Sequence, residues 1–186
     1  MYFFRVDERI IHGQVITRWL SEVDAQGIVA IDDQAANDPI ISKVLKGAVP
    51  HGLKGFVMPV ERVAKRWDDI VGSDKKYMVV AKTPATYKRL IEAGVDMKAA
   101  FPKINVGPMS EKAEAKSVGP GANVSADDMD AFEFLSNHGM EIYFQLVPDS
   151  KKNELGRGTE GIWLIFREEG TACYLYKRFL FQFCVT

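Results

Sequence analysis

The sequence has little cysteine, and the position of that cysteine limits the chemistry open to the chain. Its two cysteines, Cys173 and Cys184, both lie near the end, and residues 1–155 contain none. That excludes a disulfide framework and a thiolate metal site from most of the chain. Neither His51 nor His138 stands at metal-ligand spacing from another histidine, a cysteine or a carboxylate pair.

The chain also lacks an excess of charge of one sign and any long apolar run. A net charge of −1 gives no reason to expect binding to nucleic acid or to an anionic membrane surface. No signal peptide opens the sequence, and no apolar run approaches the length that spans a bilayer. Neither a dinucleotide-binding glycine motif nor a P-loop occurs. A soluble cytoplasmic protein is the simplest expectation.

Short apolar runs alternate along the chain with segments of helical periodicity. The runs that read as strands are 2–4, 27–31, 54–58, 77–81, 103–106 and 140–146. Most of them are apolar throughout, as in strands that are covered on both faces. This pattern predicts an α/β fold with an open, mainly parallel β-sheet and helices on both faces.

The helical segments lie between these strands. Val15, Ile16, Trp19 and Leu20 share one helix face, and the spacing after Asp38-Pro39 predicts a second helix. The apolar face of that second helix is formed by Ile40, Ile41, Val44 and Leu45. Further helices are expected over 60–70, after Thr83-Pro84 and after Ser125, and residues 107–122 read as a loop.

The residues that carry chemistry lie where the first strand gives way to the first helix. His12 falls in or beside that turn, and Gly13 after it lets the backbone approach a ligand. The first amides of a helix lack internal partners and attract anions. Arg5 and Arg9 are close in sequence, and Asp7 could orient the imidazole. A histidine in such a turn can take up a phosphoryl group and hold it.

Other polar residues follow strands at the same edge of the predicted sheet, where ligands of open α/β sheets bind. They are Asp32, Asp33, Lys82, Thr83 and Asn105. A turn explains Asp32 and Asp33 as well as a site does, and a helix cap explains Lys82 and Thr83 better than a site does. His51 between Pro50 and Gly52, and His138 before Gly139, read as residues without a function.

The run from Arg5 to Val15, Arg-Val-Asp-Glu-Arg-Ile-Ile-His-Gly-Gln-Val, closely resembles the amino-terminal signature of a known family. This family is the enzyme IIB component of the mannose/fructose/sorbose class, which includes N-acetylgalactosamine systems, of phosphoenolpyruvate-dependent sugar phosphotransferase systems. Residues 31–39, 82–84, 104–109 and 123–125 resemble it too, and the likeness extends to about residue 155.

The resemblance implies that His12 receives phosphate from an enzyme IIA domain. It implies that His12 passes the phosphate to a sugar bound by the membrane subunits IIC and IID, with no metal or cofactor. Arg9 is the first choice for the phosphate clamp and Arg5 the second, because guanidinium groups suit phosphate oxygens. Backbone amides from Gly13 and Gln14 onward would complete the cradle. Whether several copies of the chain assemble stays open. The sequence favours an amino sugar as the substrate only slightly.

Two rival functions and one atypical segment remain. The chain could be a non-catalytic α/β module that binds a small anion at the His12 turn, or a receiver domain phosphorylated on Asp32 or Asp33. The receiver is the weaker rival, because its acidic pair is expected after the first strand. Residues 156–186 hold both cysteines and seven of the 20 Phe, Trp and Tyr residues. We expect a functional domain over 1–155 and a tail that phosphotransfer does not need.

Overall fold

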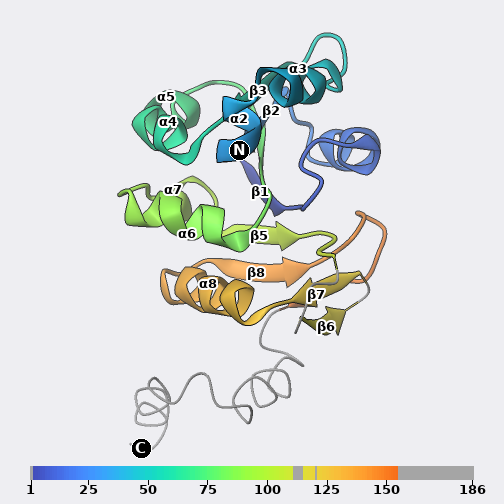
Figure 1. Cartoon of the computed structure of the whole chain (residues 1–186), viewed down its shortest axis with the longest axis vertical. Helices are drawn as coiled ribbons and strands as arrows, with labels where there is room; N and C mark the ends of the chain where they lie inside the picture. The colour runs from blue at the N-terminus through green and yellow to red at the C-terminus, as the bar shows by residue number, and fades with distance from the viewer. Residues whose placement is uncertain (1, 111–114, 120, 155–186) are drawn as a thin grey trace, which may run out of the picture. The chain divides into compact units, whose positions relative to one another are not determined.

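Seven strands form the main sheet of the computed structural model (Figure 1). The structure describes residues 2–110, 115–119 and 121–154. In spatial order the strands are β3 (Lys54–Met58), β2 (Gly27–Ile31), β4 (Tyr77–Ala81), β1 (Phe3–Val6), β5 (Lys103–Val106), β8 (Glu141–Phe144) and β9 (Asn153–Glu154). The first six run parallel, and β9 is antiparallel to β8. The open, mainly parallel sheet predicted from the sequence is confirmed.

Helices pack against both faces of this sheet. Their bounds are η1 (Val15–Trp19, a π-helix), α1 (Leu20–Glu22), α2 (Asp33–Asn37), α3 (Pro39–Gly47), α4 (Val60–Lys65), α5 (Trp67–Val71), α6 (Pro84–Glu92), α7 (Met97–Ala100) and α8 (Ala126–Asn137). None of the helices in the described part of the chain is long and apolar enough to cross a membrane.

Side-chain alternation divides the core between the two faces. On one face Phe3 of β1 joins a buried cluster with Val15 and Trp19 of η1, and α2 and α3 also contribute to this cluster. On the other face Phe4 packs against Trp67 of α5 and Tyr87 of α6. We call the face that carries Phe3 the η1 face. Arg5 lies on it, two residues along β1.

Two expectations from the sequence were wrong in detail. Residues 107–122 are not all loop, because β6 (Lys116–Gly119) pairs antiparallel with β7 (Ala122–Val124). Gly121 has a φ of +69° beside the short connection between them, which is the conformation that glycine allows in a tight turn. The helix expected over 60–70 breaks at Arg66 into α4 and α5.

The sequence did not indicate how the apolar face of α3 is oriented. Leu45 packs against the core, but Ile40, Ile41 and Val44 are exposed. Ser42, three positions before Leu45, is the residue of α3 that is buried. The helix is therefore rotated so that most of its apolar face points into solvent. The expected tail, 156–186, lies outside the described residues.

Candidate functional site

The turn between β1 and η1 carries the sequence-predicted residues. β1 ends at Val6, and the helical residues begin at Gly13. The Ile16 amide donates to the His12 carbonyl at 3.0 Å, so His12 stands at the helix start. Since strands of a parallel sheet end at one edge, this places His12 at the carboxyl edge of the sheet.

The backbone of the turn is strained at Ile10. Its φ is +58°, in the left-handed region that a β-branched residue rarely adopts. The Ile10 amide donates to the Asp7 carbonyl at 2.9 Å, and Ile10 and Ile11 are buried in the core cluster. Burial of these two side chains holds the turn in a conformation that would otherwise relax. Such strain is often found at functional sites.

Asp7 is the buried centre of the site. Its Oδ2 accepts from Arg5 Nη2 at 2.8 Å and from Arg5 Nε at 3.2 Å. Its Oδ1 accepts from the Arg9 amide at 3.2 Å and lies 3.0 Å from His12 Nε2. The Asp7 side chain has no exposed area. The carboxylate therefore holds the imidazole ring through Nε2 and does not contact Nδ1.

Arg5 lies beneath Asp7 and has no exposure to solvent. Beyond the two bonds to Asp7, its guanidinium donates to Asn105 Oδ1 and to the carbonyls of Gln145 (3.2 Å) and Leu146 (3.3 Å). These bonds occupy all five guanidinium N–H groups. Burial lowers the pKa of Arg5, while the Asp7 carboxylate acts to raise it. The structure thus places Arg5 under the site rather than at its surface.

The remaining predicted residues lie at the surface of the turn. The Arg9 side chain is 52% exposed, and its Nη2 donates to Gln14 Oε1 at 3.1 Å. Gly13 and Gln14 are exposed, while the His12 side chain is 15% exposed. An anion that approaches His12 from solvent would meet Arg9 and the first amides of the helix.

Two residues that support the site were not assigned to it from the sequence. Gly107 follows β5, and a Cβ added there would lie 2.5 Å from Arg5 Cζ and 2.9 Å from Asp7 Oδ2. The Trp19 ring lies under the Arg5 guanidinium at 4.8 Å. The sequence showed Gly107 only as part of a loop and Trp19 only as core.

The other polar residues at this edge have structural partners. Asp32 caps α2 by accepting from the Ala35 amide at 2.6 Å. Asp33 accepts from the Val60 amide at 2.9 Å and pairs with Arg89 at 2.5 Å. Thr83 stands at the N-cap of α6, and its hydroxyl oxygen lies 3.4 Å from that of Thr86. Asn105, in contrast, belongs to the Arg5 network.

The histidines expected to lack a function lie apart from this network. His51 is exposed in the turn before β3. His138 ends α8, where its Nδ1 lies 2.7 Å from the Phe134 carbonyl. Lys82 is half-buried just after β4. Across the described ranges, no group of three or more His, Cys, Asp or Glu side chains could hold a metal ion.

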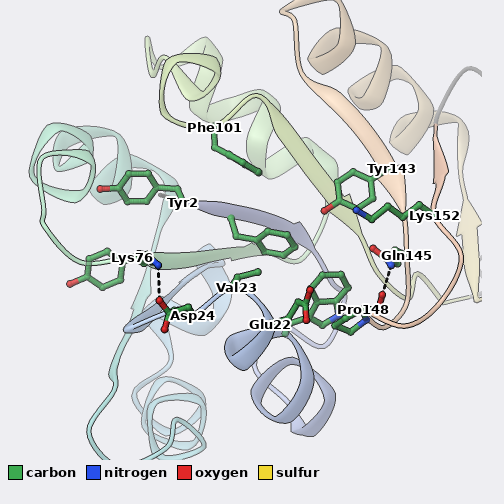
Figure 2. Close-up of a pocket in the computed structure, with 14 residues that line it drawn as sticks. Tyr2, Glu22, Val23, Asp24, Lys76, Phe101, Tyr143, Gln145, Pro148 and Lys152 are labelled. Carbon is green, nitrogen blue, oxygen red and sulfur yellow. Dashed lines mark hydrogen bonds and ion pairs between the residues drawn. The ribbon is translucent and has the colours of Figure 1, made fainter.

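A cavity of about 430 Å³ opens beside the network on the η1 face, without His12 in its lining (Figure 2). Its lining includes Trp19 and Gln145, which both contact Arg5, and Tyr143. Burial raises the pKa of Tyr143 to about 12, so its hydroxyl stays protonated at neutral pH. Gln145 Nε2 donates to the Pro148 and Ser150 carbonyls, so it is already bonded within the protein.

Comparison with known proteins agrees with this geometry. The model of the PTS system sorbose subfamily IIB component matches residues 1–158. N-acetylgalactosamine-specific phosphotransferase enzyme IIB component 1 of Escherichia coli K12 is 29% identical over 153 residues, which cover 81% of this chain and 93% of the relative. The crystal structure of manxB from Thermoanaerobacter tengcongensis superposes with a TM-score of 0.75 at 29% identity, covering 86% of this chain and 96% of that one.

A third relative is longer. The mannose-specific EIIAB component of the PTS system in E. coli K12 is 28% identical over 148 residues, which cover 80% of this chain. Those residues are 45% of the relative, so the chain spans about half the length of the mannose-specific relatives that it matches. With the family model matched over residues 1–158, the chain belongs to the sorbose subfamily of IIB components of the PTS system.

Proposed function

We propose that the chain is a cytoplasmic phosphoryl carrier that accepts phosphate on His12 Nδ1. The donor is a phosphohistidine of a IIA domain, and the acceptor is a sugar bound by the membrane subunits IIC and IID. The observation that carries this proposal is the 3.0 Å contact between His12 Nε2 and buried Asp7. Because Asp7 accepts hydrogen bonds from Arg5 as a carboxylate, we assign the His12 ring proton to Nε2. The lone pair of the neutral imidazole then lies on Nδ1.

In the transfer step the Nδ1 lone pair attacks the phosphorus atom. A new N–P bond forms on His12 as the N–P bond of the donor breaks, and its electron pair returns to the donor nitrogen. The His12 ring keeps its Nε2 proton throughout, and the positive charge that builds on the ring faces the Asp7 carboxylate. Phosphoryl transfer depends mainly on positioning and on charge neutralisation. The Asp7 contact supplies the positioning.

The surface residues supply the neutralisation. Arg9 is the clamp in this proposal, because its side chain is 52% exposed and lies on the solvent side of Asp7. The amides of Gly13 and Gln14 add donors at the positive end of the helix. Arg5 takes another role, because all of its N–H groups already have protein partners. We assign it the task of holding Asp7, and through Asp7 the imidazole.

Labelling tests the proposed function. The chain is incubated with phosphoenolpyruvate, the general phosphotransfer proteins and a IIA domain of the mannose/fructose/sorbose class. We expect one acid-labile, alkali-stable phosphate per chain, and NMR of the labelled imidazole should show phosphorus coupled to Nδ1. A chain that binds phosphate without covalent label would be an anion-binding module instead. Label on Cys173, Cys184 or another histidine would also contradict the proposal.

The domain boundary is tested with the same assay. We propose that residues 1–155 carry the function, and the family model ends close by, at residue 158. A chain ended after Leu155 should unfold cooperatively and should take up label at the rate of the full chain. Loss of folding or of uptake on truncation would show that residues 156–186 belong to the working domain.

Replacement of Arg9 by lysine tests the clamp. Lysine keeps the positive charge but loses the planar fork that contacts two phosphate oxygens, so we expect phosphoryl uptake to slow by about ten-fold or more. Stopped-flow or quenched-flow labelling gives the rate. Arg62→Lys is the matched control, because Arg62 is exposed on α4 and far along the chain from the turn. If Arg9→Lys takes up phosphate at the parent rate, Arg9 is not the clamp, and the helix amides remain as the groups that bind the phosphate.

A further inference from the structure

Helix α3 presents an apolar face to solvent. Ile40 is 76%, Val44 65% and Ile41 44% exposed. Among the described residues only one other large apolar side chain, Phe56 at 37%, is exposed. Single exposed apolar residues are common, but a cluster on one helix marks an interaction surface more often. We call Ile40, Ile41 and Val44 the α3 patch.

The α3 patch lies on the same side of the molecule as the His12 turn. Ile10 and Ile11 of that turn share a core cluster with Ala36 of α2 and Leu45 of α3. The α2–α3 segment follows the carboxyl end of β2, which is two strands from β1. Two strand spacings are about 10 Å. The start of α3 therefore flanks the sheet edge where His12 stands.

The exposed charges on the helical residues of α3 are positive, while the Asp38 carboxylate caps the start of the helix. Lys43 and Lys46 are exposed on α3, and the sequence of α3 contains no carboxylate. Arg9 adds an exposed cation beside His12. A partner that fits this surface has an apolar patch with an acidic or phosphorylated rim.

We propose that the α3 patch is the docking surface for the phosphorylated donor protein that loads His12, an inference that rests on the proposed function. The donor's phosphorus must come within about 3–3.5 Å of Nδ1, so its surface must cover the edge around His12. A standard interface takes about 800 Å² from each partner, which is a disc of roughly 16 Å radius. Such a disc centred on His12 extends over the start of α3.

The charge favours the donor over the sugar-bearing acceptor. The donor arrives with the negative charge of its phosphoryl group, whereas a sugar is neutral. The exposed residues at the turn itself, such as Arg9 and Gln14, are polar. The apolar centre that a stable interface needs must therefore come from elsewhere, and the α3 patch is the cluster on the His12 side of the sheet that can supply it.

The test is the rate of phosphoryl uptake at increasing concentrations of phosphorylated IIA domain. We expect Ile40→Gln/Val44→Gln to raise the KM for the donor by at least about ten-fold and to leave kcat within about two-fold, because docking weakens while the chemistry is unchanged. Glutamine keeps the helix, and a thermal melt checks the fold. The control is Phe56→Thr, which removes an exposed apolar side chain from the opposite face of the sheet and should change neither constant.

A second variant tests the charge independently. Lys43→Glu/Lys46→Glu keeps the apolar patch and reverses its rim, so we expect a higher KM that salt partly masks. Parent-like constants in both variants would overturn the inference while the proposed function stood. If the parent self-associates and the glutamine variant does not, the patch binds a second copy of the chain. If the variant loses only sugar phosphorylation, the patch binds the membrane subunits. Either result would also overturn the inference. Absence of label on the parent would instead contradict the proposed function itself.

Discussion

His12→Ala will abolish phosphoryl uptake and leave the fold intact. The substitution removes the only nitrogen at the turn that combines a free lone pair with an approach from solvent. The His12 side chain is 15% exposed and does not belong to the buried apolar cluster. Asp7 keeps its bonds to Arg5 and to the Arg9 amide. We therefore expect a stability loss of about 1.5–3 kcal/mol, the usual net value of a hydrogen bond to a charged group.

Two matched substitutions control this experiment. His51→Ala and His138→Ala should be labelled like the parent, because neither residue contacts the Asp7 network. Mass spectrometry of the intact chains counts the phosphate, and calorimetry measures the melting temperature. If His12→Ala still took up a full phosphate, the nucleophile would be another residue and the proposed mechanism would be wrong.

The strands could be predicted from the sequence because each is a short apolar run between turn signals. The runs 27–31, 54–58, 77–81 and 103–106 coincide with β2, β3, β4 and β5. The hairpin of β6 and β7 was missed because its strands are short and its sequence is rich in Gly and Pro. The orientation of α3 was missed for another reason. Periodicity identifies an apolar face, but it does not say whether that face meets the core or a partner.

Part of the candidate site could also be predicted from the sequence. The order of residues from Arg5 to Gln14 pointed to His12 and to Asp7 as its orienting group, and the structure brings these two side chains to 3.0 Å. The surroundings of Arg5 could not be predicted, because they depend on which strand lies beside β1. The pairing of β1 with β5 sets Arg5 opposite Asn105, 100 positions away in the chain. Burial of an arginine is rare without such partners.

The same pairing explains why Gly107 has no side chain. The Gly107 amide donates to the Val6 carbonyl at 2.8 Å, which holds its backbone against β1. A methyl group there would lie 2.5 Å from Arg5 Cζ, far inside van der Waals contact. Arg5 cannot move aside, because protein groups on three sides bond its guanidinium. Gly107→Ala must therefore break the buried pair of Arg5 and Asp7 or displace the strand.

We expect Gly107→Ala to lose at least about 3 kcal/mol of stability, because breaking a buried ion pair typically costs roughly 3–5 kcal/mol. For a domain of this size the melting temperature should fall by about 6–12 °C. Phosphoryl uptake should fall by about a hundred-fold or more at temperatures where the variant is folded, since Asp7 no longer fixes the imidazole. Gly47→Ala on α3 is the control, because a Cβ there meets no atom within 4 Å. A Gly107→Ala chain with parent-like melting and uptake would show that the Arg5–Asp7 pair does not position His12.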